Sequence, residues 1–252
     1  MHKIYALWCH PRSMSTAVER IMRERGDLAC FHEPFMYDYY AHRRVRVMPH
    51  FQPQKDHPVS FEAVRDMLLN AAQRGPVFIK EMSYYVIPRI LTDADLSQHL
   101  VNSFLIRAPQ AALASYFRLD PDFTCQEAGL EAQAVHFRGL QSKGMEPPIL
   151  QAEDIRCNAT SFVKAWWAAI GLPPADHAFD WQEEPPSDWQ QVSGWHRDVS
   201  SSKGIRPISA AEIKAQEAAF ETLAQQHLHL RDILRHHLPH YKQLRAHAMT
   251  PD

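Results

Sequence analysis

Short apolar segments alternate with amphipathic ones over the first 175 residues, and this alternation restricts the fold more than any other feature of the chain. Runs of apolar residues are typical of buried strands, whereas apolar residues spaced three and four apart indicate helices. Strands joined by helices form a parallel sheet with right-handed crossovers and helices on both faces. The sequence therefore predicts an α/β fold, a three-layer α/β/α sandwich with a central parallel sheet. We expect strands at 3–9, 28–31, 77–82, 101–106 and within 147–155, and helices at 16–25, 61–74, 108–118 and 159–172.

The last third of the chain has a different pattern. Residues 176–208 are rich in Pro, Trp and Ser and predict an extended loop, and residues 209–247 predict helix as far as Pro239. At 252 residues and 45% hydrophobic, the chain can bury one large core. We therefore expect a single domain over 1–252, with its core in 3–175 and a C-terminal loop and helical region in 176–252.

Charge and hydropathy exclude several classes of partner. The formal net charge of −2 provides no basic surface for nucleic acid. No segment approaches the roughly 18 apolar residues that a membrane span needs. The opening apolar run, "IYALWC", is too short for a signal peptide and has no small-residue cleavage site, so we expect a cytoplasmic protein.

Hydroxyl and guanidinium groups follow the first predicted strand, in the stretch "PRSMST" at 11–16. Ligands of open parallel sheets bind beyond the carboxyl ends of the strands, where a helix N-terminus attracts anions. Ser13, Ser15 and Thr16 add hydroxyl donors, and Arg12 adds a planar cation suited to phosphate or sulfate. The alternative is that Ser13 or Ser15 only caps the helix while Arg12 contacts water.

A second segment, "SFLIRAPQAALASYFR" at 103–118, repeats the order of strand, basic residue and helix. Together the two segments closely resemble the phosphosulfate-binding loop and the 3′-phosphate-binding segment of sulfotransferases that use 3′-phosphoadenosine 5′-phosphosulfate (PAPS). "PRSMST" stands where that family has a loop of the type R-S-G-S/T-T, and Arg107 and Ser115 fall at the two 3′-phosphate ligands. "ILQAEDI" and the helix ending "AAIGLP" extend the resemblance over most of residues 3–175.

The resemblance implies a P-loop nucleoside triphosphate hydrolase-like fold and an enzyme that transfers a sulfuryl group from PAPS to a hydroxyl or amine of a small-molecule acceptor, without a metal. It assigns the 5′-phosphosulfate to the loop formed by Arg12, Ser13, Met14, Ser15 and Thr16. The loop departs from the well-studied cytosolic members, because Arg12 replaces a lysine and Met14 a glycine. It is more similar to bacterial sulfotransferases, which also lack that lysine. The backbone must then tolerate a side chain at position 14.

Three further residues are candidates for catalysis. Glu33, in "CFHEPF", follows the second predicted strand and matches the glutamate that some bacterial sulfotransferases use as the base. His32 competes with it, because an imidazole titrates near neutral pH without any perturbation. Lys80 lies near another strand end and could reach the sulfate or the acceptor. The alternatives are that Glu33 only pairs with an arginine and that Lys80 is only solvated.

Two loops resemble functional segments less closely. Lys203 and Gly204, in "DVSSSKGIRP" at 198–207, are similar to the basic loop that closes over the 3′-phosphate in the family, although a plain surface turn fits equally well. Residues 35–51 combine aromatic side chains with arginines. They fit an acceptor pocket or lid, or equally a basic edge beside a core aromatic cluster.

The histidines of "HLHLRDILRHHLPH" at 227–240 raise the possibility of a metal site. His236 and His240 are four residues apart, a spacing that places both on one helix face. However, Pro239 is expected to disturb the helix between them, and no HExxH glutamate accompanies them. The sequence therefore predicts no metal site.

Two other functions stay open at this point. A nucleotide-dependent kinase would use the same topology, but it requires a P-loop lysine that "PRSMST" does not supply. A nucleotide-binding protein that has lost catalysis would keep both anion sites. The acceptor and the oligomeric state are not predicted by the sequence.

Overall fold

A single parallel sheet of five strands forms the centre of the molecule. The computed structural model describes residues 1–181, 186–195 and 202–250. The strand order is β2-β3-β1-β4-β5, so the first strand lies in the middle. Every pairing is parallel. The strands are β1 (Ile4–Cys9), β2 (Ala29–His32), β3 (Val77–Met82), β4 (Leu100–Ile106) and β5 (Ile149–Gln151).

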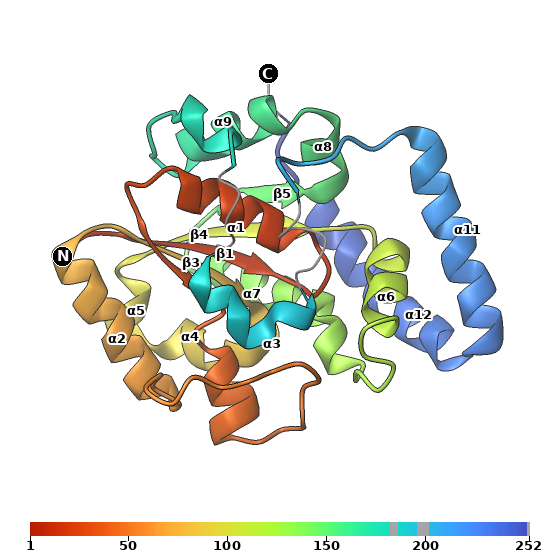
Figure 1. Ribbon diagram of the computed structural model, residues 1–252, viewed down its shortest axis with the longest axis horizontal. Coiled ribbons are helices and arrows are strands. Elements are labelled where there is room, and N and C mark those ends of the chain that lie inside the picture. The colour runs from red at the N-terminus through yellow and green to blue at the C-terminus, as the bar shows by residue number, and fades with distance from the viewer. Residues whose placement is uncertain (182–185, 196–201, 251–252) are drawn as a thin grey trace.

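Helices cover both faces of this sheet, which confirms the predicted three-layer α/β/α sandwich. In Figure 1, α1 (Ser15–Glu24), α8 (Ala152–Cys157) and α9 (Ala159–Ala169) lie above the strands. On the opposite side lie α2 (Phe61–Arg74), α4 (Arg89–Thr92) and α7 (Leu130–Gln141). Further α-helices among the described residues are α3 (Ser83–Val86), α5 (Ala94–Ser97), α6 (Pro109–Phe117), α11 (Ala210–Gln226) and α12 (His229–Arg245). None of the helices in the described part of the chain is long and apolar enough to cross a membrane.

Local signals explain why several predicted bounds agree with the structure. The predictions of helix 61–74 and strand 77–82 match α2 and β3. Ser60 caps α2, because its side chain accepts a hydrogen bond from the Ala63 N–H at 3.2 Å. The segment 147–155 is only partly strand, since β5 ends at Gln151 and the short helix α8 follows at once.

The prediction that the C-terminal helix ends at Pro239 is wrong. Helix α12 continues through Pro239 to Arg245. A proline inside a helix removes one backbone hydrogen bond, at a cost of about 3 kcal/mol. Burial of one apolar face outweighs this cost. The buried residues of that face are Leu230, Ile233, His237, Tyr241 and Leu244.

The predicted extended loop at 176–208 is also partly wrong, because it contains two 3₁₀ helices. These are η3 (Asp176–Phe179) and η4 (Ser187–Trp195). The side chains of Trp181, Trp189 and Trp195 are buried, and this burial holds the segment against the body of the domain. Of the loop quoted as 198–207, residues 198–201 lie outside the described residues.

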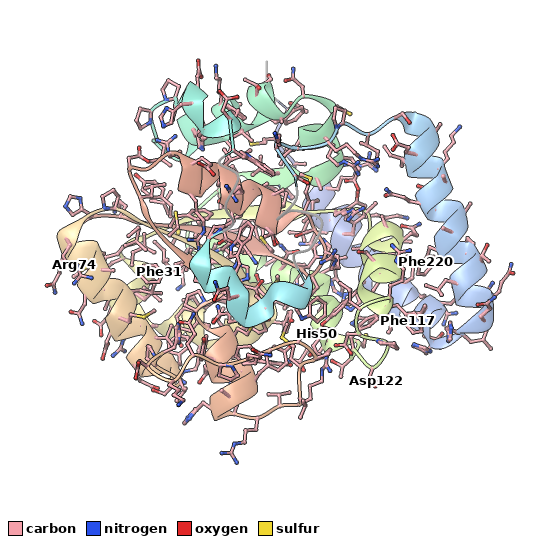
Figure 2. All side chains as sticks on the ribbon, viewed as in Figure 1. Phe31, His50, Arg74, Phe117, Asp122 and Phe220 are labelled. Atoms are coloured by element: carbon pink, nitrogen blue, oxygen red, sulfur yellow. The ribbon has the colours of Figure 1, made fainter. Side chains whose placement is uncertain are left out.

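Sheet register places the predicted site residues at one edge. Cys9 at the end of β1 pairs with Met82 at the end of β3, and His32 at the end of β2 pairs with Lys80. The segments that follow these strands therefore emerge on the same side of the sheet. Beside this edge, α11 packs along α6, which follows β4, and Phe220 of α11 is buried (Figure 2).

Candidate active site

The loop after β1 presents an open helix N-terminus. Met14 is the N-cap of α1, and no side chain caps this helix, so the alternative that Ser13 or Ser15 serves as the cap is wrong. Arg12 and Met14 have φ angles of 62° and 72°, in the left-handed region that favours glycine. Met14 thus adopts the conformation expected where related loops have glycine. The first N–H groups of α1 lack partners within the helix and can bind an anion.

Ser13 adds a polar group at this N-terminus. Its side chain is fully buried, and its Oγ has no hydrogen-bond partner among the described residues. Buried hydroxyls without partners are uncommon because desolvation costs about 1–3 kcal/mol. An anion at the helix N-terminus would satisfy this hydroxyl.

Direct contacts join the two predicted anion-binding segments. Arg12 Nε donates to Ser115 Oγ at 3.0 Å, and Arg12 Nη1 donates to the Trp195 carbonyl at 2.8 Å. Arg107 Nη1 donates to the Arg12 carbonyl at 2.8 Å. The backbone N–H of Arg107 donates to Nε2 of the buried His10 at 3.0 Å. The structure therefore brings Arg12, Arg107 and Ser115 together, as the sequence predicted.

Guanidinium groups accumulate around Arg107. Burial and the neighbouring charges of Arg156, Arg12 and Arg118 lower the pKa of Arg107 to about 10, against the opposing charge of Glu153. The sequence analysis missed Arg156, which lies in α8 just beyond β5 and donates through Nε to the Arg206 carbonyl at 2.9 Å. Arg107 was predicted because it is a basic residue directly after a predicted strand, and Arg156 likewise follows the predicted strand segment 147–155.

A cavity of about 280 Å³ lies beside these groups. Its lining includes both unpredicted arginines, Arg156 and Arg206. The predicted site residues that line it are Arg12, Met14, Ser15, Thr16, His32, Glu33, Arg107 and Gly204. Four predicted residues are not part of the described lining: Ser13 and Lys80 are buried behind it, Ser115 contacts Arg12, and Lys203 is exposed.

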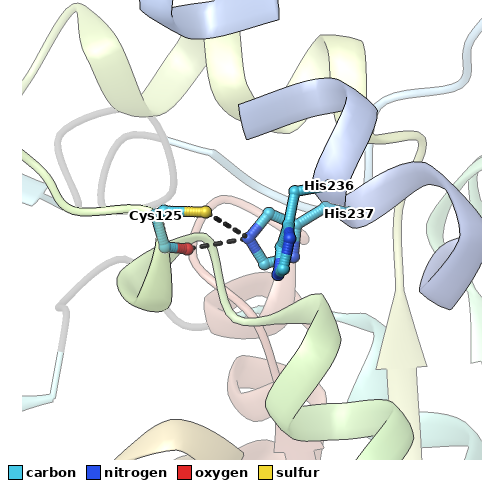
Figure 3. A group of neighbouring side chains, drawn as sticks. All are labelled: Cys125, His236 and His237. Carbon is cyan, nitrogen blue, oxygen red and sulfur yellow. Dashed lines mark hydrogen bonds between the residues drawn. The ribbon is translucent and has the colours of Figure 1, made fainter. Parts of the chain in front are cut away.

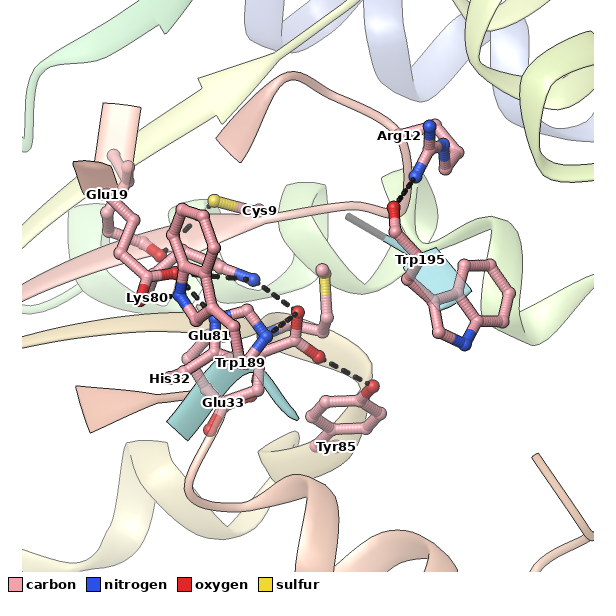
Figure 4. Close-up of polar contacts among 12 residues, drawn as sticks. Cys9, Arg12, Glu19, His32, Glu33, Lys80, Glu81, Tyr85, Trp189 and Trp195 are labelled. Carbon is pink, nitrogen blue, oxygen red and sulfur yellow. Dashed lines mark hydrogen bonds and ion pairs between the residues drawn. The ribbon is translucent and has the colours of Figure 1, made fainter. Parts of the chain in front are cut away.

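Glu33 is held at this cavity by two partners (Figure 4). Its carboxylate forms an ion pair with Lys80 Nζ, and its Oε2 accepts a hydrogen bond from the Tyr85 hydroxyl at 3.1 Å. Burial alone would raise the pKa of Glu33, but the charges of Lys80 and His32 outweigh it and lower this pKa. Lys80 is fully buried, so the alternative of a solvated lysine is wrong. The partner of Glu33 is thus this lysine and not an arginine.

A second buried carboxylate, Glu19 on α1, contacts both His32 and Lys80, the two cationic neighbours of Glu33. Its oxygens lie 2.6 Å from His32 Nδ1 and 3.8 Å from Lys80 Nζ. Glu19 also accepts a hydrogen bond from Trp189 Nε1 of η4 at 2.9 Å. Burial would raise the pKa of Glu19, but the charge of His32 and its hydrogen bond lower it, so the group is ionised.

His32 completes the network between the two carboxylates. Its Nε2 lies 3.7 Å from Glu33 Oε1, while Glu19 holds its Nδ1. The sequence analysis missed Glu19. The available signal was its position one helical turn after Ser15, on a helix whose N-terminus had already been assigned to the site.

A comparison with protein families identifies the family of this chain. A model of the sulfotransferase domain matches residues 2–248, nearly the whole chain. The chain belongs to this family. It is therefore a transferase, built as a parallel α/β/α sandwich.

Two solved structures are similar to this sulfotransferase over most of its length. The sulfotransferase domain from the Synechococcus PCC 7002 olefin synthase is 14% identical, with a TM-score of 0.49, and the match covers 89% of this chain and 94% of that one. The sulfotransferase domain from the curacin biosynthetic pathway is 11% identical, with a TM-score of 0.48, and the match covers 89% and 96%. No curated protein sequence matches the chain.

Proposed function

We propose that this sulfotransferase transfers the sulfuryl group of PAPS to a hydroxyl group of a small-molecule acceptor. The observation that carries the proposal is a single cavity lined by the loop of Arg12, by Arg107 and by Glu33. These are an anion-binding loop, a second phosphate ligand and a proton acceptor, the three groups that the reaction needs.

The residues around the loop fit the two anionic ends of PAPS. The N-terminus of α1, the unpartnered Ser13 hydroxyl and Arg12 suit the 5′-phosphosulfate. Arg107, with Arg156 and Arg206 nearby, suits the 3′-phosphate. Burial, and then repulsion from neighbouring arginines, lowers the pKa of Arg107, and a dianion at this position would offset both effects. PAPS supplies the activated sulfuryl group.

In this proposal Glu33 is the general base. Its carboxylate accepts the proton of the acceptor hydroxyl as the acceptor oxygen forms a bond to sulfur. The bond between sulfur and the bridging phosphate oxygen breaks, and adenosine 3′,5′-bisphosphate leaves. Arg12 and the α1 N-terminus stabilise the charge on the leaving oxygen, a contribution of about 3–4 kcal/mol per well-placed donor. Lys80 holds Glu33 in place and ionised.

The lining of the cavity favours an acceptor with an apolar body. Apart from the charged groups already described, its side chains are mostly aromatic or methionine, which bind apolar surface through dispersion and area burial. The apolar and aromatic side chains of the lining are Met14, Met48, Met82, Tyr84, Tyr85, Tyr116, Trp181, Val192 and Trp195. An alcohol matches this lining better than a protonated amine, because the amine would lose its hydration without a free carboxylate to pair with.

Calorimetry with product nucleotides tests the donor assignment. We expect adenosine 3′,5′-bisphosphate to bind more tightly than 5′-AMP, and more tightly than ATP with Mg²⁺. Arg107→Ala should weaken the bisphosphate about 10-fold or more and leave 5′-AMP nearly unchanged, because a charge-assisted hydrogen bond contributes about 1.5–3 kcal/mol.

Arg118→Ala is the matched control, since Arg118 is exposed and close to Arg107 but does not belong to the described cavity lining. It should bind both nucleotides nearly as the unmodified protein does. Equal affinity of the unmodified protein for 5′-AMP and the bisphosphate would contradict the proposed 3′-phosphate site.

A further inference from the structure

Two helices bring metal-binding side chains together outside the described lining of the catalytic cavity. His236 and His240 lie on α12, and Glu131 lies in the first turn of α7. One of the two reasons for predicting no metal site is wrong, because helix α12 continues through Pro239. The HExxH glutamate is absent, but it would serve as a base and not as a ligand, and a carboxylate from another helix offers the third ligand here. We propose that Glu131, His236 and His240 bind one divalent transition-metal ion that links α12 to α7.

Distances support this assignment. His236 Nε2 lies 2.9 Å from Glu131 Oε2, and one ligand atom from each of the three residues lies within 4.8 Å of the others. A zinc ion about 2.1 Å from each ligand requires ligand atoms roughly 3–3.5 Å apart. Because Glu131 and His236 are exposed and His240 is half-buried, small rotations of their side chains can close this difference.

The neighbouring His237 and Cys125 have another role (Figure 3). His237 Nε2 lies 2.7 Å from the Cys125 carbonyl, and His237 Nδ1 accepts a hydrogen bond from the Glu131 N–H at 3.3 Å. Both ring nitrogens of this buried histidine are therefore used, and neither is available to a metal. His237 instead fixes the start of α7 against α12, which holds Glu131 opposite His236.

The ligand set selects the class of metal. Imidazole nitrogens suit Zn²⁺, Ni²⁺, Cu²⁺ and Co²⁺, whereas Ca²⁺ and Mg²⁺ prefer oxygen ligands. Arg138, further along α7, acts electrostatically on His240, so its positive charge opposes a bound cation. Arg138 Nη1 also donates to Gln243 Oε1 at 2.6 Å, which directs one end of the guanidinium to α12. We expect micromolar rather than tighter affinity for Zn²⁺.

Metal binding here would stabilise the start of α7, which packs against the loop after β1. Gly129 precedes Glu131 at the start of α7 and has a left-handed φ of 82°. A Cβ on Gly129 would lie 2.9 Å from the His10 side chain, so α7 and the β1 loop are in close contact. His10 in turn accepts a hydrogen bond from the backbone N–H of Arg107. The proposed metal therefore binds to a helix that contacts the catalytic loop, without touching the cavity.

Titration calorimetry with ZnCl₂ tests the site on full-length protein that carries no histidine tag and has been treated with EDTA. We expect one saturable equivalent of Zn²⁺ and a rise in the thermal unfolding temperature. Glu131→Gln and His240→Gln should each weaken Zn²⁺ binding about 10-fold or more. His229→Gln is the matched control, because His229 is an exposed histidine of the same helix outside the cluster.

Binding of adenosine 3′,5′-bisphosphate by each variant, measured in parallel, verifies that the variant is folded. Unchanged Zn²⁺ affinity in Glu131→Gln or in His240→Gln would overturn the site. Absence of saturable Zn²⁺ binding to the unmodified protein, or equal binding of Mg²⁺, would also overturn it.

Discussion

At the scale of single residues, the grouping of Arg12, Arg107 and Ser115 could be predicted, and the network of buried charges around Glu33 could not. Arg12, Arg107 and Ser115 follow strands in a recognisable order, so the sequence alone placed them together. For Glu19 the sequence offered only its position one helical turn after Ser15, which does not distinguish an exposed glutamate from one buried between His32 and Lys80. Its role depends on how α1 packs against the end of β3.

Glu19→Gln tests this role. The amide keeps the shape of the side chain but removes the charge that holds His32 Nδ1. We expect kcat to fall about 10- to 100-fold, because a hydrogen bond to a charged carboxylate contributes about 1.5–3 kcal/mol. Affinity for adenosine 3′,5′-bisphosphate should stay the same, since Glu19 does not line the described cavity. An unchanged kcat in the folded variant would show that Glu19 is only structural.

Met14 allows a test of the loop backbone. Its φ of 72° is strained for any residue except glycine, and most of all for β-branched residues. Met14→Val should lower the free energy of unfolding by about 1–3 kcal/mol, whereas Met14→Gly should change it by less than about 1 kcal/mol. Urea unfolding of both variants measures this difference. Equal losses in the two variants would contradict a backbone origin.

At the scale of helices and strands, predictions succeeded where local chemistry decides the structure. Ser60 and the glycine after Arg74 mark the ends of α2, and β3 is apolar throughout except for two charged residues. The predictions failed where tertiary packing decides the local structure. The 3₁₀ helix η4 forms because Trp189 and Trp195 find buried positions against distant segments, and no local pattern encodes those positions.

Pro239→Ala tests why α12 continues through a proline. Pro239 is exposed, so its replacement removes no buried contact. Alanine restores a backbone N–H and avoids a cost of about 3 kcal/mol, although it also gives the unfolded chain about 0.4–1 kcal/mol more conformational entropy. We expect the free energy of unfolding to rise by about 2 kcal/mol in urea unfolding. A decrease would indicate that the proline has a specific structural role.

At the scale of the whole molecule, three buried histidines make stability depend on pH. Burial lowers the pKa of His10 and His136 to about 3 and that of His237 to about 4. The unfolded chain binds these protons near pH 6.5. Below that pH the unfolded state therefore holds more protons than the folded one, and the free energy of unfolding decreases as the pH falls toward about 3.

Urea unfolding at pH 7 and pH 5.5 measures this effect. We expect each of the three histidines to contribute a loss of about 1 kcal/mol in the free energy of unfolding. The loss between the two pH values should be about 1 kcal/mol smaller in His136→Gln than in the unmodified protein, whatever the stability of the variant at pH 7. The same pH dependence in this variant would show that His136 is not one of the groups responsible.

The proposed function requires that Glu33 remove a proton from an acceptor alcohol during sulfuryl transfer from PAPS. This role is measured by the transfer of labelled sulfuryl from PAPS to a panel of alcohols, phenols and amines, by the unmodified protein and by Glu33→Gln. We expect transfer to an apolar alcohol, and a loss of about 100-fold or more in kcat for Glu33→Gln with nearly unchanged binding of adenosine 3′,5′-bisphosphate. His32→Ala is the accompanying control and should retain more activity. Near-normal turnover by Glu33→Gln together with an inactive His32→Ala would assign the base to His32 and contradict the account.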